Sequence, residues 1–321
     1  MAKKVLVTGG AGFIGGHLVN RLLSEGHDIT VVDNLSRGDF QNLPDFHDKL
    51  KFVNGNITDF NLMDRLVEVS DVVFHLASLS RVMSSIENPD KCFEDNVRGV
   101  EVVARLCSIY KKKLVFSSSR EVYGTAMYLP VDEDHPLVPE NPYGASKLCG
   151  EKMIVAYSRC YGLNFAILRL ANVYGERDFQ RVIPIFIERT IKNEPLIVYG
   201  GQQIIDFVHV SDIVNVFLKA SNHYENITIN VGSGKGITVL DLARLIHEIG
   251  HGTGNLILKE KRKGEVERFI AKIDTAKKLL NWAPKADLKE ELTRLLNSVR
   301  KPQNILNNSA YQFCSENQIK S

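Results

Sequence analysis

The sequence has few of the features that mark a disulfide-rich or metal-binding protein. Of its 321 residues only 5 are cysteine, and they are scattered along the chain. They are Cys92, Cys107, Cys149, Cys160 and Cys314. An odd number of cysteines without metal-type spacing predicts reduced thiols in a cytoplasmic protein, with no disulfide framework and no metal site.

Long apolar runs and a strong charge excess are also missing. No stretch approaches the ~20 consecutive apolar residues that span a bilayer, and the N-terminus leads directly into a strand pattern, which argues against a signal peptide. Lys and Arg total 40 and Asp and Glu total 38, so the formal net charge is +2. Because nucleic-acid-binding proteins usually carry a basic excess, we expect neither nucleic acid nor membrane as a partner. A small anionic substrate remains compatible with this balance, since one pocket can be basic on a neutral protein.

The chain instead alternates short apolar runs rich in β-branched residues with longer amphipathic segments. Strands are predicted at residues 5–7, 29–32, 51–53, 72–74, 114–116 and 165–168, and helices at 13–25, 62–69, 93–110 and 142–160. Several of the strands are almost continuously apolar, as in parallel sheets covered on both faces. The alternation predicts an α/β fold of the Rossmann type, a doubly wound parallel sheet.

After about residue 172 the elements become shorter and the connections less regular. Further helices are predicted at residues 183–192, 211–220, 240–249 and 290–296. We therefore expect a first domain over residues 1–171 and a smaller C-terminal α/β substrate domain over 172–301, with 205–232 as a segment that can pack back onto the first. Residues 302–321 are polar and aperiodic, so we expect a frayed tail.

A glycine-rich loop directly follows the first predicted strand. Gly9, Gly12 and Gly15 are spaced three residues apart, and Phe13 begins the next predicted helix. Glycines let the backbone turn sharply and approach a pyrophosphate, whose charge meets the N-terminus of the helix. Because the strand, loop and helix come in the required order, the motif predicts dinucleotide binding rather than a generic flexible turn.

An acidic residue at the end of the second strand indicates which dinucleotide is bound. Asp33 follows Gly15 by 18 residues, close to the ~20 expected for the carboxylate that binds the adenosine ribose. Its charge would repel a 2′-phosphate, which favours NAD over NADP. Arg37 follows closely and leaves pairing with a phosphate as an alternative.

A tyrosine and a lysine four residues apart lie at the start of the helix predicted from residue 142. This spacing places Tyr143 and Lys147 on one helical face, where the cation is expected to lower the pKa of the phenol and make it a usable base. Ser119, at the end of the preceding strand, is a hydroxyl that can hydrogen-bond the substrate oxygen that Tyr143 deprotonates.

With these motifs the chain resembles the extended short-chain dehydrogenase/reductases, specifically the NAD-dependent nucleotide-sugar epimerases and dehydratases. The resemblance runs from about residue 4 to 284. Its markers include TGGAGFIG at 8–15, DNLSRG at 33–38, SSSREVYG at 117–124, YGASK at 143–147, RLANVYG at 169–175 and DFVHV at 206–210. It implies the Rossmann fold, NAD as cofactor and a UDP-linked nucleotide sugar as the substrate.

The resemblance also assigns the cofactor site. The adenosine and pyrophosphate would be held by Gly9, Gly12, Phe13, Ile14, Asp33, Asn34 and Ser36. Asn56 and Ile57 would border the adenine, with asparagine standing where relatives commonly have aspartate. The rest of the cofactor path would be lined by Leu76, Ala77, Ser78, Asn96, Ser117, Tyr143 and Lys147.

The implied reaction starts when Tyr143 removes the proton of the sugar 4-hydroxyl and C4 gives hydride to NAD. A 4-epimerase returns the hydride to the other face of the 4-keto sugar. A 4,6- or 5,6-dehydratase or a decarboxylase is the alternative, because Glu121 stands where those relatives carry a catalytic glutamate. Dehydratases also place an aspartate before it, whereas this chain has Arg120, which is no proton donor near neutral pH. The epimerase is favoured, and a catalytically silent NAD-binding scaffold is disfavoured because Ser119, Tyr143 and Lys147 are all kept.

For the substrate, the resemblance implies Ser119, Asn172, Val182, Tyr199 and Arg262, with Tyr199 stacking on uracil and Arg262 binding phosphate. One departure from the family is Ile205, where many relatives have a pyrophosphate-binding arginine. Relatives commonly pair through helices that include the one bearing Tyr143, so we expect a homodimer.

Overall fold

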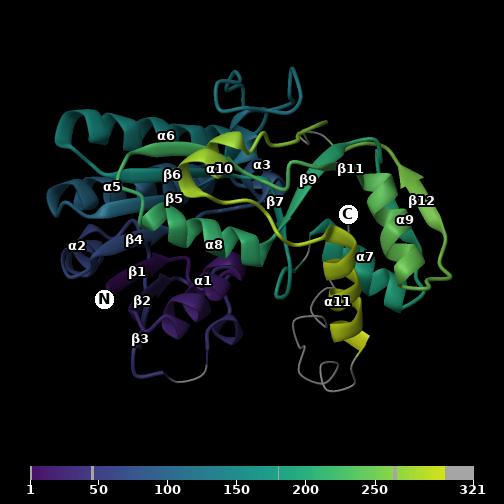
Figure 1. The fold of residues 1–321 in the computed structure, drawn as a ribbon, viewed down its shortest axis with the longest axis horizontal. Helices are drawn as coiled ribbons and strands as arrows, with labels where there is room; N and C mark the ends of the chain where they lie inside the picture. The colour runs from purple at the N-terminus through teal and green to yellow at the C-terminus, as the bar shows by residue number, and fades with distance from the viewer. Residues whose placement is uncertain (1, 45–46, 180, 263–265, 301–321) are drawn as a thin grey trace.

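A seven-stranded parallel sheet forms the centre of the molecule (Figure 1). The structure is a computed structural model that describes residues 2–44, 47–179, 181–262 and 266–300. The strand order is β10-β6-β5-β4-β1-β2-β3, and every neighbouring pair is parallel. The strands are β1 (Lys4–Thr8), β2 (Asp28–Asp33), β3 (Leu50–Asn54), β4 (Val72–His75), β5 (Lys113–Ser119), β6 (Phe165–Leu170) and β10 (Ile227–Val231). The six strands expected from the sequence all lie within β1 to β6, so the doubly wound sheet is confirmed.

Successive side chains along each strand point to opposite faces of the sheet, where they pack in two different hydrophobic cores. In β1, Val5 and Val7 pack in one core, whereas Leu6 packs in the other. The first core lies under α1 (Phe13–Ser24), α8 (Val210–Ser221) and α10 (Asp274–Leu280). The second lies under α2 (Phe60–Glu68), α5 (Gly99–Ile109) and α6 (Pro142–Tyr161). Burial on both faces explains why these strands are almost continuously apolar.

The direction of the chain through the sheet reverses at β1. From β1 it moves outward to β2 and β3, and then it returns to β4 on the other side of β1. In open α/β sheets, ligands bind outside the carboxyl ends of the strands at such a reversal. A ligand site is therefore expected at the edge formed by the ends of β1, β2 and β4.

The later part of the chain builds smaller sheets beside the large one. β7 (Asn172–Tyr174), β9 (Ile204–His209) and β11 (Gly236–Thr238) form one, and β8 (Leu196–Tyr199) pairs with β12 (Leu256–Lys259). Together with α7 (Val182–Ile191), α9 (Val239–Ile249) and α11 (Leu288–Arg300), they enclose a third core. Between these elements the chain returns to the large sheet, where β10 pairs with β6.

One predicted helix is divided in the structure. Residues 93–110 were expected to form a single helix, but the chain forms α4 (Pro89–Phe93), a π-helical turn over Glu94–Arg98 and then α5. The short helix α3 (Val82–Glu87) precedes them. The π-helical turn holds Asn96, which the resemblance assigns to the cofactor path; π-helical turns are frequent at functional sites.

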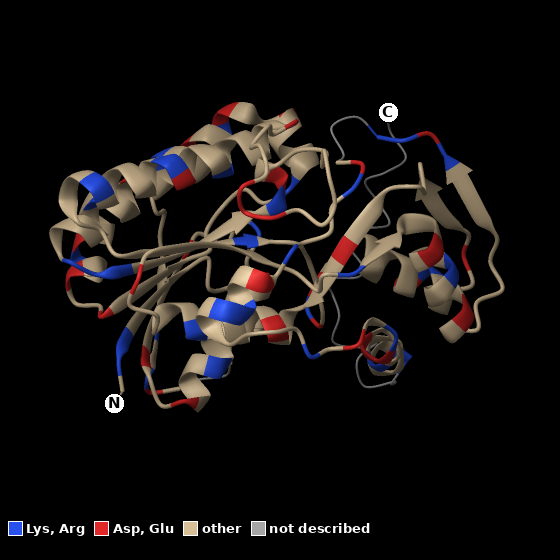
Figure 2. Cartoon of the chain, turned by 45° about the horizontal axis from the view of Figure 1, so that its top comes forward, with Lys and Arg blue, Asp and Glu red and all other residues tan. Residues whose placement is uncertain are grey.

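Charge and hydropathy vary over the molecule without a surface of one sign. Figure 2 shows Lys and Arg interspersed with Asp and Glu over both parts of the chain. Within the described residues, no helix combines the length and apolarity needed to cross a membrane. The expected frayed tail lies outside the described residues.

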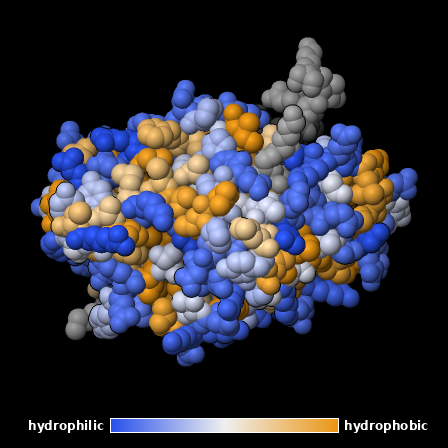
Figure 3. Space-filling model, turned by 90° about the horizontal axis from the view of Figure 1, so that it is seen from above, coloured by the Kyte–Doolittle hydropathy of each residue, from blue (hydrophilic) through white to orange (hydrophobic). Residues whose placement is uncertain are grey.

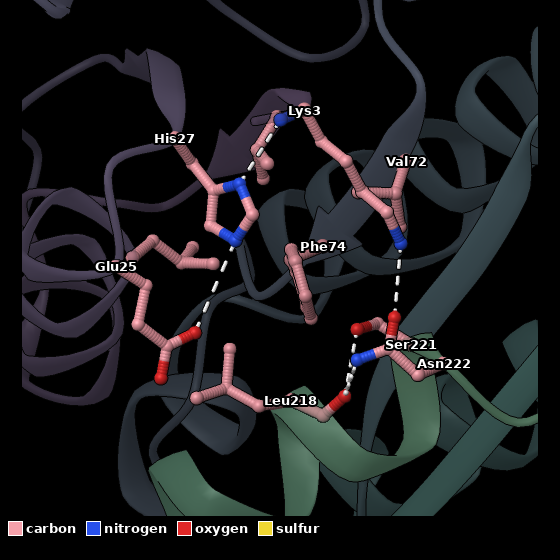
Figure 4. A pocket seen from close by; sticks show the side chains of 10 residues that line it. Lys3, Glu25, His27, Val72, Phe74, Leu218, Ser221 and Asn222 are labelled. Carbon is pink, nitrogen blue, oxygen red and sulfur yellow. Dashed lines mark hydrogen bonds and ion pairs between the residues drawn. The ribbon is translucent and has the colours of Figure 1, made fainter. Parts of the chain in front are cut away.

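A hollow of about 250 Å³ opens at the amino-terminal edge of the large sheet (Figure 4). The backbone N–H of Lys3 donates to Nδ1 of His27 over 3.0 Å, and its ammonium donates to Oδ1 of Asn222 over 2.9 Å. Val5 and Val72, near the starts of β1 and β4, also line it. Because ligands of this fold bind at the opposite ends of the strands, the hollow is separate from the candidate active site.

Candidate active site

The glycine loop is shaped so that side chains would not fit. Gly9 has φ +70°, and a Cβ atom there would lie 2.6 Å from the backbone nitrogen of Ala77. A Cβ on Gly15 would clash with the carbonyl oxygen of Gly9. Gly12 is the N-cap of α1 and the first turn, beginning at Phe13, contains no acidic residue. The backbone N–H groups at this helix end therefore form a cradle suited to a phosphate.

Asp33 ties the glycine loop to the end of β2. Its carboxylate accepts hydrogen bonds from the backbone N–H of Ala11 (3.0 Å) and Leu35 (2.9 Å). Burial raises the pKa of Asp33, while these two bonds lower it. Each oxygen keeps a lone pair for another donor, which suits the ribose hydroxyls of an adenosine.

The other residues assigned to the adenosine end border the same edge of the sheet. The side chain of Asn34 is exposed and accepts a hydrogen bond from the backbone N–H of Ser36 (3.0 Å). The side chain of Asn56 accepts from the backbone N–H of Thr58 (3.1 Å), and Ile57 is buried in the core beneath α5. The side chains of Asn34 and Asn56 thus stabilise the turns in which they lie. The second lone pair of each side-chain oxygen remains available to a ligand.

Asn96 holds the loop after β4, to which the resemblance assigns part of the cofactor site. It is 1% exposed, and its side chain both accepts from the N–H of Leu79 (2.7 Å) and donates to the carbonyl of Leu79 (3.0 Å). It also donates to Oγ of Ser146 over 2.9 Å. The segment before Leu79, which contains Leu76, Ala77 and Ser78, follows β4 directly. Asn96 therefore fixes this loop to α6.

Tyr143 and Lys147 occupy the first two turns of α6, which is capped by the side chain of Asn141. The ammonium of Lys147 donates to the carbonyl of Ser117 over 2.8 Å and lies 5.9 Å from the centre of the Tyr143 ring. The hydroxyls of Tyr143 and Ser119 are hydrogen-bonded to each other. The structure thus brings Ser119, from the end of β5, next to Tyr143 and Lys147 on α6.

The expected pKa of the tyrosine is wrong for the chain alone. The sequence predicted that Lys147 lowers it, but burial raises the pKa of Tyr143 to about 12, and the bond from Ser119 offsets only part of this. Burial also lowers the pKa of Lys147 to about 7. Both shifts have the same origin, because a dry site disfavours the charged form of either group. Further positive charge at the site is needed to ionise the phenol near neutral pH.

Glu121 is held in place on both of its carboxylate oxygens. One oxygen accepts from Nδ2 of Asn141 (2.8 Å), and the other pairs with Nη2 of Arg120 (3.0 Å). Arg120 also donates through Nε to Oδ1 of Asn172 (2.7 Å), the first residue of β7. The side chains of Arg120 and Glu121 are only 10% and 8% exposed. Arg120 thus links Glu121 to the assigned substrate residue Asn172.

The remaining substrate residues lie in the later part of the chain. Val182 begins α7, and Tyr199 ends β8. The guanidinium of Arg262 lies 4.0 Å from the centre of the Tyr199 ring, so the two assigned residues are neighbours. The stacked arginine covers one face of the ring.

Three arginines that the sequence does not group together act on one buried carboxylate, that of Asp178. Arg37, Arg81 and Arg181 all act electrostatically on the carboxylate of Asp178. They come from loops that are far apart in the sequence, and only Arg37 had been considered as a phosphate partner. Neither Arg81 nor Asp178 belongs to a recognisable motif, so proximity in the fold is the only signal that finds them.

The histidines and cysteines that the structure describes add no further chemical site. His75 is fully buried, where burial lowers its pKa to about 3, and its Nδ1 is 2.7 Å from Oγ1 of Thr8. His75 is therefore a packed core residue. Over the described ranges, no group of three or more His, Cys, Asp or Glu could hold a metal ion.

Comparison with known proteins identifies the family. The model of the "NAD dependent epimerase/dehydratase family" matches residues 5–232. The chain is 42% identical over 302 residues to a putative UDP-glucose 4-epimerase of Methanocaldococcus jannaschii, covering 91% of this chain and 97% of that protein. It is 31% identical over 310 residues to UDP-glucuronic acid decarboxylase 1 of Xenopus tropicalis, covering 93% and 72%.

A solved structure agrees in fold as well as in sequence. The UDP-glucose 4-epimerase of Thermotoga maritima, determined with UDP-glucose, superposes with a TM-score of 0.88 at 35% identity, covering 92% of this chain and 98% of that one. The glycine cradle and Asp33 fit the NAD that the family uses. The chain therefore belongs to the NAD dependent epimerase/dehydratase family.

Proposed function

We propose that the chain is an NAD-dependent nucleotide-sugar 4-epimerase that acts on a UDP-linked hexose, UDP-glucose/UDP-galactose or the N-acetylhexosamine pair. The observation that carries this proposal is the cluster of Ser119, Tyr143 and Lys147 beside the cofactor cradle, with Glu121 engaged on both oxygens. Similar proteins named UDP-glucose 4-epimerase support the choice of substrate. The residues proposed to hold the nucleotide sugar are Asn172, Val182, Tyr199 and Arg262.

In the proposed mechanism, the residues of the chain orient the sugar and move one proton. Tyr143 takes the proton of the 4-hydroxyl while Ser119 hydrogen-bonds the same oxygen. Lys147, anchored on the carbonyl of Ser117, supplies positive charge that favours the phenolate. NAD, when bound, supplies hydride chemistry at C4 of the sugar and a positively charged nicotinamide. When the sugar presents its other face, Tyr143 would return the proton to the same oxygen while the bound cofactor would supply hydride at C4, and the epimer would result.

The second candidate is decarboxylation or dehydration through Glu121, and similar proteins include UDP-glucuronic acid decarboxylases. Those reactions need an additional acid or base next to the sugar. Glu121 instead bonds Asn141 and Arg120 and is buried, so it is arranged as a structural carboxylate. This arrangement favours epimerisation.

The reaction can be identified from the fate of the sugar protons. We expect purified chain incubated with UDP-glucose or UDP-N-acetylglucosamine in heavy water to produce the 4-epimer without deuterium at C5, as followed by proton NMR. UDP-glucuronic acid serves as the third substrate, since its loss of carbon dioxide would reveal a decarboxylase. Deuterium at C5 with a keto or unsaturated product would instead support a dehydratase.

The variant Glu121→Gln tests whether the reaction needs the Glu121 carboxylate as an acid or base. It therefore distinguishes the epimerase from the decarboxylase or dehydratase. Because the amide keeps an oxygen that can accept from Asn141, we expect epimerase turnover to fall by no more than about tenfold. Removal of an acid–base group lowers turnover by roughly 100- to 10,000-fold. A loss in that larger range, with an unchanged melting temperature, would contradict the structural role of Glu121.

We also propose a homodimer and a division into two domains. Ile109 and Tyr161, at the ends of α5 and α6, are 54% and 60% exposed. Figure 3, which views the molecule from above, shows hydrophobic patches among hydrophilic side chains. These features support a helix-mediated contact, and the separate third core supports a substrate domain within 172–301.

The cysteines that the structure describes are free thiols, which is consistent with a cytoplasmic location.

A further inference from the structure

The guanidinium of Arg120 lies beside the candidate catalytic residues with one of its nitrogens unused. Its side chain is only 10% exposed. Nε donates to Oδ1 of Asn172 over 2.7 Å, and Nη2 pairs with Oε1 of Glu121 over 3.0 Å. Nη1 is buried and has no hydrogen-bond partner among the residues that the structure describes. Nη1 carries two of the five N–H donors of a guanidinium, and both therefore lack an acceptor.

A buried donor without an acceptor destabilises the free chain, because folding has removed the water that would otherwise bond to it. Such groups are rare in folded proteins, and one that lies beside an active site points to a ligand that completes the bond. The centre of the Phe269 ring lies 5.9 Å from the guanidinium carbon of Arg120. An aromatic ring is only a weak acceptor for an N–H group, so Nη1 still lacks an ordinary hydrogen bond.

The charge around Arg120 indicates which kind of acceptor is missing. Glu121 already neutralises the guanidinium, since the two side chains are paired at 3.0 Å and are both almost fully buried. A ligand carboxylate or phosphate would place a second negative charge next to Glu121 in a site with little water, where like charges repel strongly. A hydroxyl oxygen accepts the N–H groups without that repulsion. Nη1 therefore suits a hydroxyl better than an anionic group.

The position of Arg120 indicates where on the ligand this hydroxyl lies. Arg120 directly follows Ser119 and begins the 3₁₀ turn Arg120–Val122 at the end of β5. Ser119 is hydrogen-bonded to Tyr143, and in the proposed function these two hydroxyls bind the 4-oxygen of the sugar. On a hexose, the carbons on either side of C4 carry the 3-hydroxyl and the CH2OH group with the 6-hydroxyl. Both hydroxyls are therefore neighbours of the oxygen that Ser119 binds.

We infer that Nη1 of Arg120 donates to a sugar hydroxyl next to C4, the 3- or the 6-hydroxyl, and that Arg120 is a specificity-determining residue for the sugar. The inference rests on the proposed function, because it requires the sugar to bind beside Ser119. The bonds of Nε to Asn172 and of Nη2 to Glu121 fix the direction of Nη1 before the sugar binds. An arginine held in this way gains the sugar contact with little further loss of side-chain entropy.

The test measures the binding of sugars that lack one hydroxyl. Calorimetry is performed on NAD-loaded Tyr143→Phe protein, which binds a sugar without turning it over, with UDP-glucose, UDP-3-deoxyglucose, UDP-6-deoxyglucose and UDP. Three proteins in this background are compared: the parent, Glu121→Gln, and Glu121→Gln with Arg120→Met. Glu121→Gln is the matched control because it keeps Arg120, and removing both charges together avoids a buried carboxylate without a partner. Arg120→Lys, which keeps a charge for Glu121 but lacks Nη1, is a second variant with the same expected pattern.

The parent is expected to bind UDP-glucose about 10- to 100-fold more tightly than the deoxy sugar that lacks the bonded hydroxyl, the range for one charge-assisted hydrogen bond. Adding Arg120→Met to Glu121→Gln should weaken the binding of UDP-glucose by the same factor. It should leave the affinity for that deoxy sugar unchanged. The affinity for UDP, which has no sugar, should be the same in all three proteins. The deoxy sugar that shows this pattern identifies the hydroxyl.

Two patterns would overturn the inference. If Arg120→Met weakened UDP-glucose and both deoxy sugars by the same factor, Arg120 would act on the site as a whole, through Asn172, and not on one hydroxyl. If the affinity for UDP-glucose did not change, the contact with the Phe269 ring would be all that Nη1 needs. Absence of UDP-glucose binding in the parent would contradict the proposed function as well, whereas sugar binding that does not depend on Arg120 would overturn this inference alone.

Discussion

Tyr143→Phe is expected to lower kcat for 4-epimerisation by about 100- to 10,000-fold, the usual contribution of a positioned acid–base group. The variant removes the only atom through which this residue can exchange a proton with the sugar. The phenylalanine ring keeps the packing against Lys147, whose ammonium lies 5.9 Å from the ring centre. Turnover is measured with the coupled conversion of UDP-glucose to UDP-galactose.

The same substitution elsewhere on α6 provides the control. The hydroxyl of Tyr157 donates to Glu101 over 3.1 Å, about four turns beyond Tyr143 and away from the site. Tyr157→Phe should keep kcat within about twofold of wild type, because the hydrogen bond that it removes lies away from the site. If Tyr143→Phe retained full activity while binding NAD normally, the proposed mechanism would be wrong.

Glu151→Gln is expected to destabilise the chain by about 3–5 kcal/mol, because it leaves a buried arginine without its ionic partner. Glu151 accepts from Nη2 of Arg169 (2.7 Å) and from Oγ of Ser118 (2.5 Å), and its side chain is 4% exposed. Nη1 of Arg169 in turn donates to the hydroxyl of Tyr123. Urea unfolding followed by circular dichroism measures the free energy of unfolding.

Two further variants establish whether charge is the cause. Glu101→Gln breaks the pair with Arg98, whose side chain is 51% exposed, and should cost no more than about 1 kcal/mol. The double variant Glu151→Leu/Arg169→Met removes both buried charges and should recover most of the loss, since apolar replacements of buried pairs are often neutral. If the double variant were as unstable as Glu151→Gln, packing rather than the unpaired charge would explain the effect.

The network around Glu151 also bears on catalysis. Glu151 lies one turn after Lys147 on α6, and Ser118 follows Ser117, whose carbonyl holds the lysine ammonium. Loss of the Glu151 contacts therefore loosens both segments that position Lys147. These are the part of α6 that bears the lysine and the end of β5, whose Ser117 carbonyl accepts from its ammonium. A drop in kcat accompanying the loss of stability is the consequence.

The fold and the cofactor cradle were predictable from local sequence signals. Several of the strands β1 to β6 have almost continuous apolar runs, and the loop between Thr8 and Phe13 has glycines at positions where a Cβ atom would clash. The spacing of Tyr143 and Lys147 fixes their common helical face. These features depend on neighbours in sequence, which is why they can be recognised without the structure.

Features that depend on distant neighbours could not be predicted. Arg37 bonds Ser80, 43 residues further along the chain, and no motif connects either to Arg181. The direction of the Tyr143 pKa shift was also missed, because burial depends on the whole surrounding fold. The chemistry of Arg120 as a poor proton donor follows from its residue type, but its bridge from Glu121 to Asn172 depends on the fold.

The place of β10 in the large sheet has a consequence for how the protein is made. This strand pairs with β6 but is separated from it in the sequence by β7, α7, β8, β9 and α8. A ribosome therefore releases much of the smaller sheets before it releases the last strand of the larger one. Until residues 227–231 emerge, the edge of β6 has unpaired backbone groups that can bind other nascent chains. The order of strands thus exposes the growing chain to aggregation at a defined point in its synthesis.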